Sequence, residues 1–174
     1  MVGIGLVLGI GLVVAAPLHA QRAEPSPVMK KLGVMAGEWR GTAVINGREG
    51  RMNAVSYEKV ESKLGGLALW VYGRHVDAAD TTKIVHEAVG MLYYDGPAQK
   101  LKFVPMVMNG LTAETWANAT EQGMDWGFAL PNNAGQIRYH VDLSQPDTWI
   151  ETGEYSRDGT QWLPTIRMEL KKVR

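Results

Sequence analysis

Apolar and polar residues alternate along several short segments of this chain. In segment 136–144, apolar residues occupy every second position, and charged or polar residues stand between them. The four segments with this period carry the apolar sets Ile137, Tyr139, Val141 and Leu143; Trp39, Gly41, Ala43 and Ile45; Leu101 and Phe103; and Met124, Trp126, Phe128 and Leu130. A period of two predicts β-strands whose apolar side chains face a core and whose polar side chains face water.

Turn-forming residues interrupt the chain at intervals of roughly eight to twelve residues, which is typical of short strands joined by hairpins. Many of these interruptions contain Asn-Gly, Asp-Gly or Gly-Gly pairs, which accept the positive φ of tight turns. They fall at 46–47, 65–66, 77–80, 95–97, 109–110, 122–123, 132–135, 145–147 and 158–159. We therefore predict an all-β fold, an antiparallel up-and-down β-barrel of about ten strands, because closure leaves no unpaired edge. Segment 28–35 is predicted to form a short N-terminal helix.

Two predicted strands, 67–72 and 85–94, are apolar on both faces. Their outer faces must also be covered, and the short helix, a loop or a partner subunit could do this. An exposed apolar patch would favour a homodimer.

The first 20 residues differ from the rest of the chain. Residues 2–18 carry no charge, and the apolar run ends in Ala-Pro-Leu-His-Ala-Gln. This pattern predicts a signal peptide at 1–20, a flexible leader at 21–27 and a barrel domain at 28–174. The mature protein would then be periplasmic or secreted and away from the membrane. A retained membrane anchor is the alternative, since about 17 apolar residues is the short limit of a span.

Charge and cysteine content exclude several classes of function. The chain has 18 basic and 18 acidic residues, so its formal net charge is zero. Without a basic field, it has no feature that would collect nucleic acid. The absence of cysteine excludes thiolate nucleophiles, thiolate metal sites and disulfides.

Four short sequences support a family resemblance: GEWRG at 37–41, VESKLGG at 60–66, VHEAVG at 85–90 and LYYD at 92–95. With the hairpin spacing, they resemble the lipocalin-like (calycin) superfamily over residues 31–173, and especially its bacterial branch of small secreted barrels of unknown function. The resemblance implies that Gly37 and Trp39 are structural. It also implies that Trp39 closes one barrel end beside a basic residue of the last strand, for which Arg167 is the candidate.

A related ten-stranded group has a similar opening motif and binds haem through a histidine near its C-terminal end. No histidine follows His140 here, so we predict no cofactor. Haem ligation involving His86 and a methionine is kept as an alternative.

Three histidines follow the predicted signal peptide. His86 is predicted to face inward with Ile84, Ala88 and Gly90, where it could anchor a ligand. The alternative is a histidine whose hydrogen bonds are made by a neighbouring group. His140 is predicted on a polar outer face and His75 on the surface at a strand end. Gly90 stands where a zinc helix beginning with His86 would need its second histidine, so no metal site is predicted.

The inward aromatic residues Phe103, Trp126, Phe128 and Tyr139 predict an apolar pocket, since a barrel wider than about eight strands leaves a cavity. Plain core filling is the alternative. The leading hypothesis is a non-enzymatic barrel that binds a small hydrophobic or amphipathic ligand through these residues and His86. An enzyme that uses His86 as acid or base, and an interaction module without a ligand, are the other hypotheses.

Overall fold

The computed structural model describes residues 23–47 and 50–173. The predicted signal peptide and the first two residues of the leader lie outside the described residues. Within the described ranges, no helix combines the length and apolar character that a bilayer span requires.

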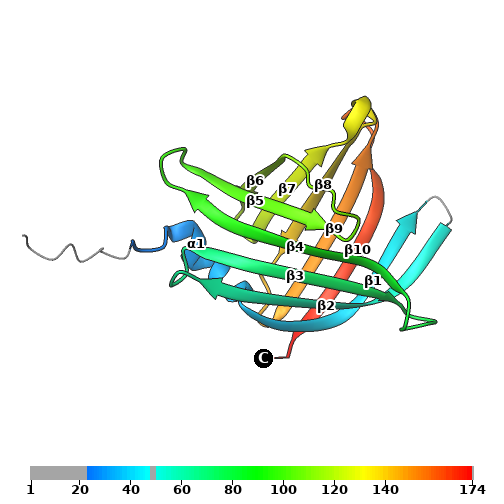
Figure 1. Ribbon diagram of the computed structural model, residues 1–174, viewed down its shortest axis with the longest axis horizontal. Helices are drawn as coiled ribbons and strands as arrows, with labels where there is room; N and C mark the ends of the chain where they lie inside the picture. The colour runs from blue at the N-terminus through cyan, green and yellow to red at the C-terminus, as the bar shows by residue number, and fades with distance from the viewer. Residues whose placement is uncertain (1–22, 48–49, 174) are drawn as a thin grey trace, which may run out of the picture.

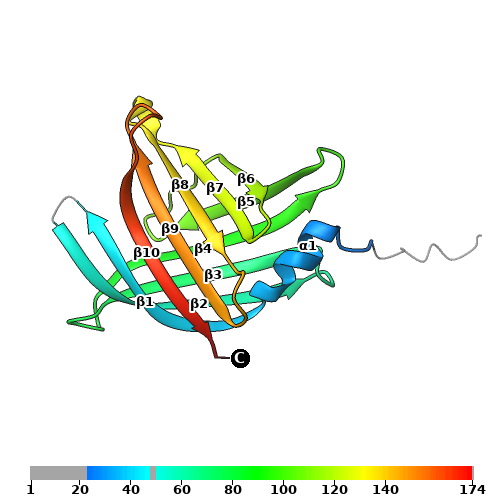
Figure 2. The same ribbon diagram turned by 180° about the vertical axis from the view of Figure 1, so that it is seen from behind.

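Ten antiparallel strands form a closed barrel in which each strand pairs with its neighbours in sequence, and the last pairs with the first (Figures 1 and 2). The strands are β1 (Gly37–Gly47), β2 (Gly50–Lys63), β3 (Ala68–Asp77), β4 (Ile84–Asp95), β5 (Lys100–Val107), β6 (Thr115–Ala119), β7 (Gly123–Ala129), β8 (Gln136–Asp142), β9 (Thr148–Ser156) and β10 (Leu163–Lys172). A short 3-10 turn, η2 (Pro131–Asn133), connects β7 to β8. The predicted up-and-down barrel is confirmed.

The short N-terminal helix α1 (Pro27–Leu32) continues into the 3-10 turn η1 (Gly33–Met35). Ser26 caps the helix by accepting a hydrogen bond from the Met29 amide at 3.2 Å, a frequent way to satisfy a free N–H group at a helix start. The apolar side of the helix, with Met29, Leu32 and Met35, is buried in the core cluster. The helix therefore covers one end of the barrel (Figure 2).

Two lysines fasten this helical segment to the barrel. The Lys31 Nζ donates to the backbone carbonyls of Thr120 and Glu121 in the β6–β7 loop, at 2.9 and 2.6 Å. The Lys172 Nζ donates to the Val34 carbonyl at 3.0 Å. Because each ammonium is a charged donor, these bonds are stronger than neutral ones.

Trp39 lies at the helix-covered end with 3% of its surface exposed. Its indole N–H donates to the Met35 carbonyl at 2.8 Å, and its ring meets Trp149 edge to face. The basic group near its ring is the Lys172 ammonium at 5.2 Å, in place of the expected Arg167. Arg167 pairs with Val44 farther along β10 and forms an exposed ion pair with Glu169, because the strand register places Lys172 opposite Trp39.

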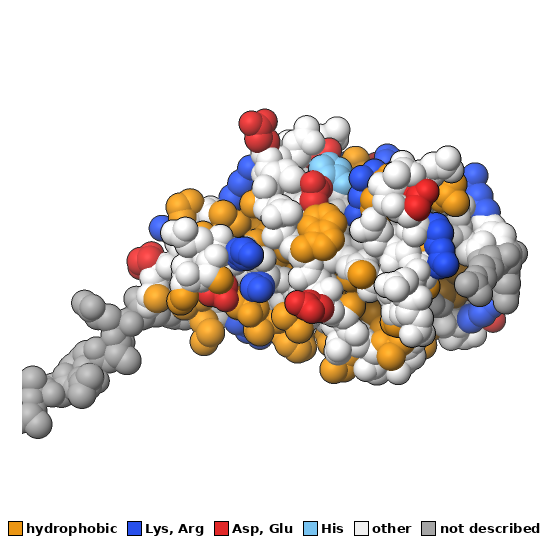
Figure 3. Space-filling model, turned by 90° about the horizontal axis from the view of Figure 1, so that it is seen from above, with side chains coloured by type: hydrophobic (Ala, Val, Ile, Leu, Met, Phe, Trp, Pro, Cys, Tyr) orange, Lys and Arg blue, Asp and Glu red, His pale blue; other side chains and the backbone are white. Residues whose placement is uncertain are grey.

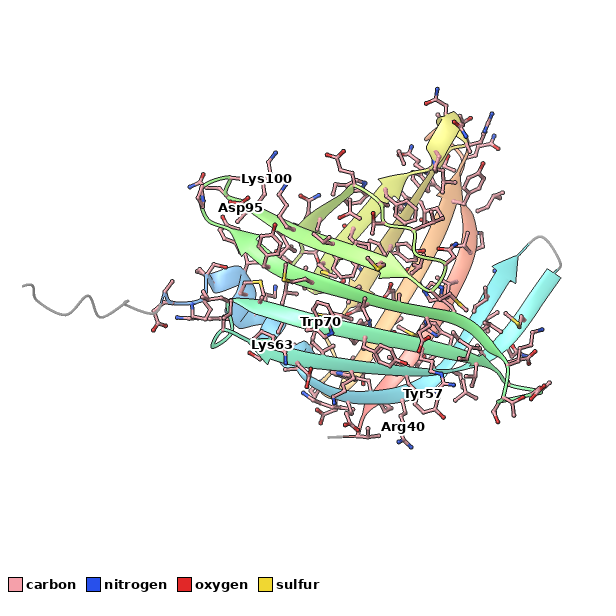
Figure 4. The ribbon with its side chains drawn as sticks, viewed as in Figure 1. Arg40, Tyr57, Lys63, Trp70, Asp95 and Lys100 are labelled. Carbon is pink, nitrogen blue, oxygen red and sulfur yellow. The ribbon has the colours of Figure 1, made fainter. Side chains whose placement is uncertain are left out.

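Acidic and basic side chains are mixed on the outer surface. Seen from above, hydrophobic side chains lie between groups of both signs (Figure 3), in keeping with the formal net charge of zero. On the outer face of β1 and β2, the Arg40 guanidinium lies 5.4 Å from the Tyr57 ring, and Figure 4 shows Arg40 projecting away from the barrel.

An apolar row crosses the outer face of β3, β4 and β5. Trp70 pairs with Met91, and Met91 pairs with Val104; their exposures are 41%, 40% and 50%. Figure 4 shows Trp70 on the outside of β3. The helix covers the barrel end and leaves this row exposed, so of the three possible covers, the helix, a loop or a partner subunit, the helix does not shield these residues.

Candidate functional site

A cavity of about 750 Å³ occupies the barrel between the helix-covered end and the opposite loops. Met35 and Trp149 line its inner end, and Leu111, Thr112 and Pro131 line it at the loop end. The interior is thus packed solid near the helix and hollow beyond it. This volume is within the range of about 300–1,000 Å³ typical of small-molecule sites.

The four aromatic residues expected to face inward all lie on the cavity wall. Trp126 stacks on Tyr139 with ring centroids 4.2 Å apart and meets Phe103 edge to face at 4.8 Å. Phe128 lies farther along β7, with its ring centroid 6.3 Å from that of Trp126. Together they form a continuous apolar wall from β5, β7 and β8, which we call the aromatic wall.

Three inward-facing glycines make room for site side chains. A Cβ added at Gly90 would lie 2.5 Å from the Phe103 ring, and one at Gly153 would lie 2.7 Å from the Tyr139 ring. At Gly73, a Cβ would lie 2.5 Å from a carboxylate oxygen of Glu58. Glycine inside a strand commonly marks such a close approach.

His86 faces the cavity from β4, and His75 lies opposite it on β3. Their ring centroids are 5.5 Å apart. The expectation that His75 is a surface residue is wrong, because it occupies an inward position of β3 and is 5% exposed. The apolar residues on both faces of this strand hid its alternation in the sequence.

Burial keeps both imidazoles neutral near pH 7. Desolvation, together with the neighbouring His86, lowers the pKa of His75 to about 4. Desolvation also lowers the pKa of His86. The Nδ1 of His75 is 2.7 Å from the Ser56 hydroxyl, so one hydrogen-bonding group of this ring is already satisfied.

Two inward carboxyl groups complete the site, and sequence reasoning missed both. Glu58 lies on β2 and Glu151 on β9, and both line the cavity. Desolvation by burial and the neighbouring Glu151 raise the pKa of Glu58 well above its ordinary value. Desolvation raises the pKa of Glu151 to about 7, although hydrogen bonds from the Trp149 and Trp126 indoles oppose the shift. A signal was present in the strand parity, since Glu58 is in phase with Ser56 and Val60, and Glu151 with Trp149.

The Ser56, His75 and Glu58 side chains are neighbours but do not form a nucleophilic site. The His75 Nε2 is 3.9 Å from the Glu58 carboxylate, which is beyond hydrogen-bond distance. Ser56 has no exposed surface, so a substrate in the cavity cannot reach its hydroxyl. Among the residues that the structure describes, His86 makes no hydrogen bond to a glutamate or tyrosine.

The inward positions of β10 are Ile166, Met168 and Leu170, so the C-terminal histidine of the haem-binding group has no counterpart here. The described part of the cavity wall holds the Glu58 and Glu151 carboxyl groups but no lysine or arginine. No group of three or more His, Cys, Asp or Glu side chains suited to a metal occurs within residues 23–47 and 50–173.

The closed ten-stranded barrel, the helix at one end and the interior cavity define a lipocalin-like barrel fold. No protein-family model matches this chain, and no curated protein sequence matches it. Among solved structures, it is similar to Rv2717c from M. tuberculosis, with a TM-score of 0.65 and 14% identity, covering 87% of this chain and 100% of that one. It is also similar to the S-type phycobiliprotein lyase CPES from Guillardia theta, with a TM-score of 0.56 and 10% identity, covering 83% and 91%. At these identities the likeness shows the fold alone.

Proposed function

We propose that this protein is a secreted or periplasmic binding protein that holds a small hydrophobic or amphipathic ligand in its barrel without transforming it. The observation that carries the proposal is the cavity of about 750 Å³ lined by the aromatic wall. Each 100 Å² of apolar ligand surface removed from water would contribute about 2.5 kcal/mol to binding. The polar groups at Glu58, Glu151 and His86 would fix the ligand's orientation.

Two features support binding over catalysis. His86 makes no hydrogen bond to an acidic or basic side chain in the described part of the chain, whereas general acid–base catalysis usually relies on a group positioned by others. Ser56 is out of a ligand's reach. Secretion is proposed from the apolar segment 1–20, which lies outside the described residues.

Uptake of the neutral fluorescent probe N-phenyl-1-naphthylamine tests the proposal. We expect its emission to rise on binding and the protein's tryptophan emission to fall, because Trp126 lies on the cavity wall. Ala88→Trp fills the cavity from β4 and should abolish the signal in a protein whose circular dichroism is unchanged. Absence of any emission change with the wild-type protein would contradict the proposal. Native mass spectrometry of the protein from its own host would identify a co-purified ligand.

Trp126→Ala should weaken probe uptake and lower the free energy of unfolding by about 3–5 kcal/mol, because the indole contacts both Tyr139 and Phe103. Trp70→Ala is the matched control, since Trp70 lies on the outer face of β3 and is 41% exposed. Urea unfolding and probe titration should separate the two variants. Equal behaviour would show that the aromatic wall does not form the binding surface.

A further inference from the structure

The Glu58 carboxyl group differs from most buried acids in its hydrogen bonding. Glu58 is 8% exposed and makes no hydrogen bond to any residue that the structure describes. The His75 Nε2 lies 3.9 Å from the Glu58 Oε1, on a ring that burial keeps neutral. The Glu58 side chain lines the cavity, so a bound ligand can supply the partner that buried polar groups normally have.

Glu151, on β9, provides a second acceptor on the wall of the same cavity. The Trp149 indole N–H donates to its Oε2 at 3.2 Å, and a carboxylate can accept several more hydrogen bonds. Glu58 and Glu151 are close enough to act on each other electrostatically. A positive group between them would remove this repulsion.

The other cavity-lining residues favour a cation over an anion. Within the described ranges, the wall contains three glutamates, Glu58, Glu114 and Glu151, but no lysine or arginine. An anionic headgroup would therefore be buried beside carboxyl groups without a counter-charge, which is strongly unfavourable. The aromatic wall adds ring faces that attract a cation, and the Thr165 hydroxyl is a buried polar group without a partner at the same cavity.

We propose that the ligand is an amphipathic amine, whose protonated nitrogen binds between Glu58 and Glu151 and whose apolar body lies against the aromatic wall. This inference rests on the proposed binding function and names the chemical class of its ligand. Because the imidazoles of His75 and His86 are neutral, the carboxyl groups of Glu58 and Glu151 are the anionic partners of the ammonium group.

Binding of such an amine is linked to proton release. The titratable groups around the site are Glu58, Glu151, His75, His86 and Tyr139, with Glu114 at the loop end. Burial raises the pKa of both inner carboxyl groups, so each must lose a proton to pair with the ammonium. The affinity for an amine should therefore increase as pH rises from 5.5 to 8 and Glu151 ionises, whereas that for a neutral alcohol should not increase.

Three probes with the same alkyl chain, decylamine, decanol and decanoate, test the inference by displacement of N-phenyl-1-naphthylamine at pH 7.5. We expect decylamine to bind at least about tenfold more tightly than decanol, a difference of about 1.4 kcal/mol, and decanoate to bind most weakly. Calorimetry in two buffers of different ionisation enthalpy should detect proton release with decylamine but not with decanol.

The variants Glu58→Gln and Glu151→Gln, singly and together, should reduce the preference for decylamine without loss of decanol binding. Glu61→Gln and Glu154→Gln are matched controls on the outer faces of the same two strands, and they should keep the preference. Equal affinity of the wild-type protein for decylamine and decanol would overturn the inference but leave the proposed function intact, as would an unchanged preference in the double variant. Failure of N-phenyl-1-naphthylamine and all three alkyl probes to bind would overturn both.

Discussion

At the scale of single residues, Glu151 shows how the barrel interior changes ordinary chemistry. The side chain lies among Trp149, Trp126 and Tyr139, and this desolvation raises its pKa to about 7. An aqueous glutamate would be fully ionised at that pH. The protein thus keeps an acid at neutral pH in a form that can give up its proton when a positive partner arrives.

Glu151→Gln should change how stability depends on pH. Between pH 4.5 and 7 the unfolded chain releases the Glu151 proton while the folded protein keeps it, so this group lowers the free energy of unfolding as pH rises through that window. The Glu151→Gln variant has no carboxyl group at this position, so it does not lose stability in this way. Relative to the wild-type protein, it should therefore gain on the order of 1–3 kcal/mol between pH 4.5 and pH 8, as measured by urea unfolding at both values.

The comparison with wild type is needed because His75 acts in the opposite direction. Its pKa is lowered to about 4 in the folded state, so it stabilises the fold above pH 6.5 and loses that contribution as pH falls toward 4. The difference between the two proteins cancels this effect. A difference that is the same at both pH values would contradict the assignment of Glu151 as a buried acid.

At the scale of the elements, the inward glycines set the shape of the site. Gly90, Gly153 and Gly73 each lie under a large or charged side chain of a neighbouring strand. Glycine weakens a strand interior. At these positions, however, the missing side chain leaves room for Phe103, Tyr139 and Glu58 along the cavity wall. The position of the glycines in the strands thus determines where the cavity surface lies.

Gly153→Ala should lower the free energy of unfolding by about 1–3 kcal/mol, a usual cost of overpacking. The new methyl group would lie 2.7 Å from both the Tyr139 ring and the Ile166 side chain. Gly33→Ala is the control, because no atom lies within 4 Å of its added Cβ and its φ is −57°; it should be neutral or stabilising by up to about 1 kcal/mol. Equal urea midpoints would mean that the wall adapts around Gly153.

The hairpin spacing and the alternating segments were sufficient to predict the barrel and the inward aromatic residues, since period and turn chemistry are local properties. His75, Glu58 and Glu151 were not identified as one cluster, because β2, β3 and β9 come together only when the barrel closes. Lys172 was missed for a related reason. The pairing register of β1 with β10, which places it at Trp39, depends on long-range contacts.

At the scale of the whole molecule, the protein exposes an outer apolar row of Trp70, Met91 and Val104. Because of this row, a homodimer remains our prediction. We expect the sedimentation coefficient to rise with protein concentration, because burying this row would remove apolar surface from water. The double variant Trp70→Ser/Met91→Ser should reduce the rise. Leu163→Ser is the control, as Leu163 is even more exposed, at 62%, but lies on β10. A wild-type protein that stays monomeric at every concentration would contradict the prediction.

The lysine-fastened helix has a consequence for exchange kinetics. Because this helix covers one end of the barrel, we expect an occupant to enter and leave at the opposite end, where residues of segments 108–114 and 130–135 line the cavity. Capture and escape then share one transition state, so a cross-link between these segments should slow both rates by the same factor. The dissociation constant would stay constant while the residence time lengthened.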